Sequence, residues 1–321
     1  MQVDLKPNEL LTYQGISPRP TDFDEYWDRA LAEMNAVDPK VELRPAKFHC
    51  PGVECFDLWF TGVRGARVYA KYLRPAGKAE PLPTVVVFHG YSGDAGDWHD
   101  KLNWVQGGMC VAALDCRGQG RGWSEDQGGN KGNTFHGQIV RGLDDETPDN
   151  LMFRHIFLDC AELIKIVMSF PEVDAERIGV LGGSQGGALT YAAASLVPEV
   201  KVACAVYPFL SDYKRVWEMD MDERAYVELK EYLRHTDPYH EHIDEFFYRL
   251  GYIDIQNLAP RIRAKLWMYT GLMDNVCPPS TQFAAFNKVT SEKKYILCPD
   301  FGHEGIPRVN DDIFETMLEE L

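Results

Sequence analysis

A serine between closely spaced glycines is the feature of this sequence that most directly indicates chemistry. Gly182, Ser184 and Gly186 form a G-x-S-x-G motif, which follows a short apolar run and leads directly into an alanine-rich stretch. In a strand–turn–helix segment, the sharp turn exposes the serine hydroxyl above the sheet, and glycines tolerate the close backbone packing around it. The motif predicts a nucleophile at Ser184. The alternative is a glycine-rich helix start with a capping serine.

A serine hydroxyl needs a histidine base to act as a nucleophile at neutral pH, and a carboxylate to orient that base. Where the nucleophile lies on such a turn, the acid and then the histidine follow it in the chain. Four histidines follow the serine: His235, His240, His242 and His303. The first three lie in a charged helical stretch, whereas His303 lies in a loop after an apolar run. We therefore predict His303 as the base; the alternative is an ordinary surface-loop histidine.

Three aspartates compete for the role of the orienting acid. Asp274 directly follows the apolar run KLWMYTG, within GLMDNVCPP, where the end of a strand would place it beside the base. Asp300 precedes the histidine by three residues and could instead form a turn. Asp254 precedes the strand and would lie at its other end. We predict Asp274, with Asp300 as its rival.

The oxyanion that forms when a serine attacks an ester requires N–H donors. One predicted donor is Gln185, because the residue after the nucleophile also lies at the N-terminus of a helix. The other is Tyr91, in the loop that follows the apolar run TVVVFHG. The nearby His89 side chain is expected to be a structural partner in that loop rather than a base.

Neither a metal nor another cofactor is predicted. His240 and His242 are two residues apart, a spacing that directs side chains to different faces of a helix. The eight cysteines contain no Cys-x-x-Cys pair, and most lie in apolar runs. An even number permits disulfides, but a core of this size does not need them, so we expect buried reduced thiols.

The net charge of the chain limits the classes of molecule that it is expected to bind. The chain has 321 residues, with 49 acidic against 33 basic side chains, a net charge of −16 and a sequence pI near 5.0. Such a surface repels phosphate backbones and anionic lipids, so neither nucleic acid nor a membrane is expected as a partner. The sequence begins MQVDLKPNEL, without the basic flank and apolar stretch of a signal peptide, which favours a cytoplasmic location.

Holding these residues together requires strands that end at one edge of a sheet. Six short apolar runs are candidate strands buried on both faces: TVVVFHG, MCVAALD, RIGVLGG, KVACAVYPF, KLWMYTG and KKYILCP. Helical patterns lie between most of them, at residues 150–170, 185–197, 279–290 and 309–321. Strand alternating with helix predicts an α/β fold, with a mainly parallel central sheet and helices on both faces.

We expect the whole chain, 1–321, to form one domain around this sheet. The N-terminal extension, 1–45, contains an apolar stripe that predicts a docked helix over 21–34, beginning with a capping box at Thr21 and Asp24. Two segments of alternating polarity, at 53–62 and 66–74, predict an antiparallel pair at the edge of the sheet.

Two further stretches interrupt the alternation. Residues 121–149 form a long glycine-rich loop, and residues 211–260 are expected to be a helical insertion, with helices over 221–234 and 237–250. The insertion is either a lid over the site or an ordinary surface helix pair. The loop carries four apolar side chains, Trp123, Phe135, Ile139 and Val140, which would be buried by contact with another subunit. Alternatively, the loop folds back over its own subunit.

Three motifs together give the chain a more specific resemblance. Arg117-Gly118-Gln119 follows one candidate strand, GGSQGG occupies 182–187, and His303-Glu304 lies near the C-terminus. With this series, the chain resembles the acetyl xylan esterase / cephalosporin C deacetylase family, carbohydrate esterase family seven, along its whole length. Family members have the α/β-hydrolase fold.

The resemblance implies a function and an assembly. It implies that Ser184, Asp274 and His303 form a catalytic triad, with Tyr91 and Gln185 as oxyanion donors, and that the Arg117 run is structural. It also implies a cytoplasmic esterase that removes acetyl groups from short xylo-oligosaccharides and cephalosporin C, and that assembles as a ring-like homohexamer.

Other functions remain open on the residues alone. The serine motif also occurs in prolyl-oligopeptidase-like serine peptidases, although this chain lacks the repeats of an N-terminal propeller. A broad small-ester carboxylesterase is another alternative. A non-catalytic binding module is a third, but such a module would be expected to have lost a member of the triad.

Overall fold

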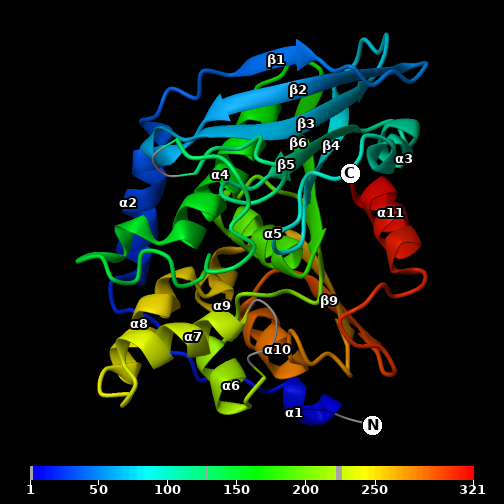
Figure 1. The fold of residues 1–321 in the computed structure, drawn as a ribbon. Helices are drawn as coiled ribbons and strands as arrows, with labels where there is room; N and C mark the ends of the chain where they lie inside the picture. The colour runs from blue at the N-terminus through cyan, green and yellow to red at the C-terminus, as the bar shows by residue number, and fades with distance from the viewer. Residues whose placement is uncertain (1–2, 127–128, 222–225) are drawn as a thin grey trace.

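A mixed β-sheet forms the frame of the molecule, and the computed structural model describes residues 3–126, 129–221 and 226–321. Within these residues, nine strands lie in the order β1-β2-β3-β5-β4-β6-β7-β8-β9 (Figure 1). Their bounds are Glu42–Pro45 (β1), Val53–Thr61 (β2), Arg67–Pro75 (β3), Leu82–Phe88 (β4), Cys110–Asp115 (β5), Val173–Gly183 (β6), Val202–Val206 (β7), Lys265–Gly271 (β8) and Lys293–Cys298 (β9).

The strand directions divide the sheet into two parts. From β5 to β9 every neighbouring pair is parallel, whereas β1, β2 and β3 pair antiparallel and β3 joins β5 antiparallel. The six apolar runs supply the parallel strands, and the alternating pair forms the antiparallel side, as the sequence predicts. The prediction that all six are buried on both faces is wrong for β9, which lies at the border of the sheet and is only partly buried. Together with the flanking helices, this is the α/β-hydrolase fold.

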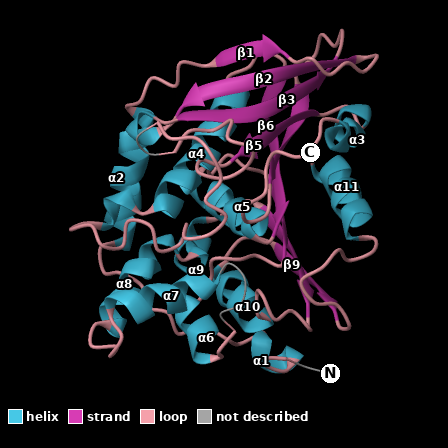
Figure 2. Cartoon of the chain, in the orientation of Figure 1, coloured by secondary structure: helices cyan, strands magenta, loops and turns pink. Residues whose placement is uncertain are grey.

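Helices cover both faces of the sheet (Figure 2). They are α1 (Pro7–Leu10), α2 (Phe23–Asn35), α3 (Leu102–Gln106), α4 (Met152–Met168), α5 (Gln185–Leu196), α6 (Tyr213–Glu218), α7 (Val227–Thr236), α8 (Ile243–Leu250), α9 (Ile255–Leu258), α10 (Pro279–Lys288) and α11 (Val309–Glu320). The larger core packs α2, α4 and α5 against one face, while α3 and α11 cover the other with a smaller cluster that includes Trp104 and Met317.

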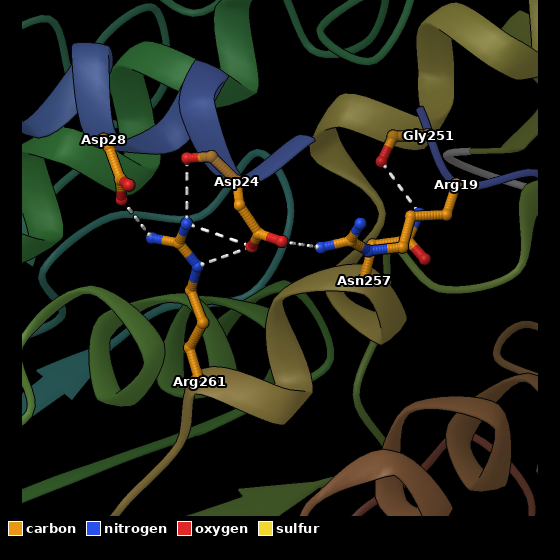
Figure 3. A network of polar contacts seen from close by, with 6 residues as sticks. All are labelled: Arg19, Asp24, Asp28, Gly251, Asn257 and Arg261. Atoms are coloured by element: carbon orange, nitrogen blue, oxygen red, sulfur yellow. Dashed lines mark hydrogen bonds and ion pairs between the residues drawn. The ribbon is translucent and has the colours of Figure 1, made fainter. Parts of the chain in front are cut away.

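The prediction of a docked N-terminal helix is confirmed, but the predicted capping box is wrong. Helix α2 buries Phe23, Tyr26 and Trp27 on its apolar stripe, and its N-cap is Asp22. The carboxylate of Asp24 instead contacts Arg19 at 2.6 Å and Arg261 at 3.1 Å (Figure 3). Asp24 is therefore engaged by a nearby arginine and by one 237 residues away, rather than in a local cap.

The long loop 121–149 packs largely onto its own chain. Ile139 is fully buried in the larger core, and Val140 packs against that core. The Trp123 ring packs against the Tyr69 ring, with 4.9 Å between the ring centroids. Phe135, by contrast, is 71% exposed. The folded-back alternative thus describes most of the loop's apolar side chains, and an interface role remains a prediction.

Between β7 and β8 the chain forms α6, α7, α8 and α9. The predicted helix 221–234 corresponds to α7, although residues 222–225 of that prediction lie outside the described residues. Across the described ranges, no helix is both long enough and apolar enough to cross a bilayer.

Candidate active site

The turn between β6 and α5 has the geometry expected for an exposed nucleophile. Ser184 has φ 58° and ψ −120°, a strained conformation for a residue with a side chain. A Cβ on Gly186 would lie 2.2 Å from the Phe88 carbonyl oxygen, and one on Gly182 would lie 2.6 Å from it. Both glycines are therefore required because the end of β4 passes directly beside the turn.

His303 lies between the serine and an aspartate. Its Nε2 is 2.9 Å from Ser184 Oγ, and its Nδ1 is 2.9 Å from Asp274 Oδ2. The Asp274 side chain is fully buried, and its Oδ1 accepts hydrogen bonds from two backbone N–H groups, at 2.9 Å from Val276 and 2.8 Å from Cys277. The aspartate is thus held rigidly, so it can orient the imidazole.

The rival candidates lie elsewhere. Asp300 is exposed, and Asp254 is buried at the N-terminus of α9, where it accepts the Gln256 N–H at 3.1 Å. His235 lies in the last turn of α7. The His240 ring packs against the Trp217 ring, with 5.5 Å between the ring centroids. The structure therefore brings together the three residues that the sequence order favours.

The two residues predicted as oxyanion donors lie on segments that approach each other. Gln185 begins α5, and Tyr91 follows the end of β4. The segments come close, since a Cβ on Gly90 would lie 4.0 Å from the Gly183 carbonyl oxygen. His89 Nε2 accepts the Cys116 N–H at 3.0 Å, while its Nδ1 lies 2.8 Å from the Gly90 carbonyl, which agrees with the predicted structural role. Burial lowers the pKa of His89, which favours the neutral form of the ring.

The R-G-Q segment supports this region in two ways. The buried Arg117 guanidinium donates to both carboxylate oxygens of Asp159, at 2.6 and 2.5 Å. Gln119 Nε2 donates to Gln185 Oε1 at 2.8 Å, and Gln119 Oε1 accepts the Ser92 N–H at 3.0 Å. One amide side chain thus joins the loop after β4 to the residue after the serine.

Sequence reasoning missed Cys277 as a neighbour of this site. The ligand atoms of Asp274, Cys277 and His303 lie within 4.8 Å of one another. Burial raises the pKa of the Cys277 thiol well above its usual value. Since the aspartate and the histidine also hydrogen-bond each other, we interpret the group as part of the hydrogen-bonded site. Its position three residues after Asp274 was the only available sequence signal.

Comparison with known proteins places the chain in a family. The acetyl xylan esterase (AXE1) family model matches residues 1–320. Acetyl esterase Axe7A from Xylanibacter ruminicola is 28% identical over 310 residues, which cover 93% of this chain and 66% of that protein. The chain thus spans about two thirds of the length of this curated relative.

Two solved structures are similar over their full length. Acetyl xylan esterase 1 from Thermoanaerobacterium sp. JW/SL YS485 is 53% identical, with a TM-score of 0.95, covering 98% of this chain and 99% of that one. Acetyl xylan esterase from Paenibacillus sp. R4 is 34% identical, with a TM-score of 0.92, covering 99% and 100%. With the family model matching nearly every residue and the fold shared end to end, the chain belongs to the acetyl xylan esterase family of carboxylic ester hydrolases, within the α/β-hydrolase superfamily.

Proposed function

We propose that the protein removes acetyl groups from sugar esters through a covalent acetyl-enzyme on Ser184. The observation that carries this proposal is the pair of 2.9 Å contacts that link Ser184 Oγ, His303 and Asp274. Ser184 Oγ attacks the acetyl carbonyl while His303 Nε2 takes its proton, and the Asp274 carboxylate stabilises the resulting imidazolium. The N–H groups of Tyr91 and Gln185 stabilise the oxyanion.

His303 acts in the completion of the first half-reaction and again in the second. His303 returns the proton to the leaving alcohol, which departs from the tetrahedral intermediate as the acetyl-enzyme forms. A water molecule then gives a proton to His303 and attacks the acetyl carbonyl. Collapse of this second intermediate breaks the bond to Ser184 Oγ, which takes the proton back from His303, and acetate leaves.

The proposed substrates are short acetylated xylo-oligosaccharides and cephalosporin C. This assignment rests on the family resemblance and on the relatives named acetyl xylan esterase. We further propose a homohexamer, consistent with the exposed Phe135 on the loop 121–149, and a cytoplasmic location, which the eight free thiols favour.

A pair of chromogenic substrates tests the reaction class. We expect fast turnover of 4-nitrophenyl acetate and no measurable turnover of a dipeptide 4-nitroanilide. The reverse preference would indicate a serine peptidase instead. Faster turnover of the octanoate than of the acetate would indicate a lipase-like carboxylesterase.

The nucleophile has its own test. Ser184→Ala should lower kcat by about 10³-fold or more with unchanged circular dichroism and melting temperature, because the serine supplies the attacking oxygen. An organophosphate should label Ser184 in the parent protein. A fully active Ser184→Ala variant would contradict the mechanism.

A further inference from the structure

A buried carboxylate on α7 connects three separate parts of the chain. Glu228 is 1% exposed. Its Oε1 accepts a hydrogen bond of 2.6 Å from the Tyr91 hydroxyl. Its Oε2 accepts hydrogen bonds from the backbone N–H groups of Ile139, at 2.7 Å, and Val140, at 3.2 Å. Burial raises the pKa of this carboxyl, while the phenol and backbone donors oppose that rise. A carboxyl group this buried is stable in the fold only because these donors replace water.

Tyr91 is partly buried, and its contacts connect α7 and the long loop to the site. Its hydroxyl oxygen also accepts the Gln138 N–H at 3.1 Å, and its ring packs edge-on against Phe209, with 5.8 Å between ring centroids. The Phe209 N–H in turn donates to the Ser184 carbonyl oxygen at 3.1 Å. The hydroxyl of Tyr91 is thus hydrogen-bonded to α7 and the long loop. Its ring packs against Phe209, whose backbone is hydrogen-bonded to Ser184.

We propose that Glu228 is a positioning residue, which fixes the Tyr91 side chain and thereby holds the Tyr91 backbone N–H toward the oxyanion formed at Ser184. This inference rests on the proposed function, in which that N–H is one of two oxyanion donors. Releasing the phenol lets the loop after β4 shift. An N–H displaced from the oxyanion stabilises the transition state less, whereas it contributes little to substrate binding.

Two variants interrupt the connection at different points. Glu228→Ala removes the acceptor of three hydrogen bonds, those donated by the Tyr91 hydroxyl and by the Ile139 and Val140 N–H groups. Tyr91→Phe removes only the hydroxyl and keeps the ring and the backbone N–H. With 4-nitrophenyl acetate, we expect kcat to fall about 10- to 100-fold in Glu228→Ala and about 3- to 10-fold in Tyr91→Phe, which is less than the roughly 10²–10³-fold loss of deleting a donor outright. KM should stay within about twofold, since ground-state binding is unaffected.

Conservative and matched variants separate positioning from general packing. Glu228→Gln keeps an oxygen for the two backbone donors and should recover most of kcat. Glu231→Gln is the control, because Glu231 lies on the same helix with its side chain 53% exposed, 3.7 Å from His136. It should match the parent. The double variant Tyr91→Phe/Glu228→Ala should lose little more than Glu228→Ala alone, because both changes break one connection.

Binding of methylboronic acid, which forms a tetrahedral adduct on a reactive serine, supplies a second readout. Its affinity should fall by about the same factor as kcat/KM in Glu228→Ala and Tyr91→Phe. A lower melting temperature with parental kcat and parental boronate affinity would show a purely structural role and overturn the inference. If Glu228→Ala does not fold, Tyr91→Phe decides by the same criteria. A fully active Ser184→Ala variant would instead remove the proposed function itself.

Discussion

At the residue scale, the choice between two aspartates can be resolved by substitution. Asp274→Asn should lower kcat about 10⁴-fold with a small change in KM, because an amide neither fixes the required imidazole tautomer nor stabilises the imidazolium. Asp300→Asn is the matched control on the same loop as His303, and its exposed side chain should make it nearly silent. Steady-state kinetics on 4-nitrophenyl acetate would measure both. If Asp300→Asn lost most of its kcat while Asp274→Asn lost little, Asp300 would be the orienting acid instead.

The residues of the site differ in how well the sequence predicts them. Ser184 has a motif, and chain order then leaves His303 and Asp274 as the favoured partners, which the structure places within 2.9 Å contacts. Glu228 has no such signal. Its contact with Tyr91 spans 137 positions, and a glutamate in a charged helical segment is ordinarily solvated. Only the packing of α7 against the long loop reveals that this side chain is buried.

At the element scale, the turn between β6 and α5 should tolerate no added side chain. Gly186→Ala would place a methyl group 2.2 Å from the Phe88 backbone oxygen, which cannot rotate away. We expect a loss of at least about 2 kcal/mol in the free energy of unfolding. Gly305→Ala is the control, because nothing lies within 4 Å of its added Cβ. Equal melting temperatures for the two variants would contradict this account of the turn.

Helix α4 carries a histidine that should make stability depend on pH. Burial, reinforced by the charges of Arg117 and Arg154, lowers the pKa of His155 to about 3. Between about pH 6.5 and 3 the unfolded chain therefore binds a proton that the folded chain does not. The free energy of unfolding then falls as pH decreases, by about 2 kcal/mol from this residue at pH 5.

Substitution isolates this contribution. Urea unfolding of His155→Gln at pH 7.5 and pH 5 should show about 2 kcal/mol less acid destabilisation than the parent. His99→Gln, which replaces a histidine side chain 69% exposed, should behave like the parent. The hypothesis fails if both variants keep the full acid sensitivity.

The elements that the sequence did not predict are the short ones. Strand β1 and helices α1, α3, α6 and α9 contain four to six residues each, too few to show a full hydrophobic period. The capping-box error has a different cause, because Arg261 approaches Asp24 from a position 237 residues away. Local patterns were reliable where an element carries an uninterrupted apolar run, as β5 and β7 do in the parallel part of the sheet, although these strands contain only six and five residues.

At the scale of the whole molecule, the proposed assembly has a direct test. Light scattering at micromolar concentration should give a mass several times 36.5 kDa. Phe135→Asp should lower that mass, because a charge at an apolar contact is costly to bury, and aspartate tolerates the left-handed conformation at this position, where φ is 63°. Tyr239→Asp is the control, at a side chain 86% exposed in the loop between α7 and α8. A parent mass near 36.5 kDa would exclude the hexamer.

The two outer strands of the sheet also affect how copies of this chain can meet. Strand β1 has only four residues, with charged side chains at Glu42 and Arg44 and a proline without an N–H at position 45. At the opposite border, β9 begins with Lys293 and Lys294. Short, charged or proline-containing borders resist pairing with a second chain, which protects against amyloid-like aggregation. Copies of this protein should therefore associate through loops and helices, and concentrated solutions should not form fibres by extending the sheet from one molecule to the next.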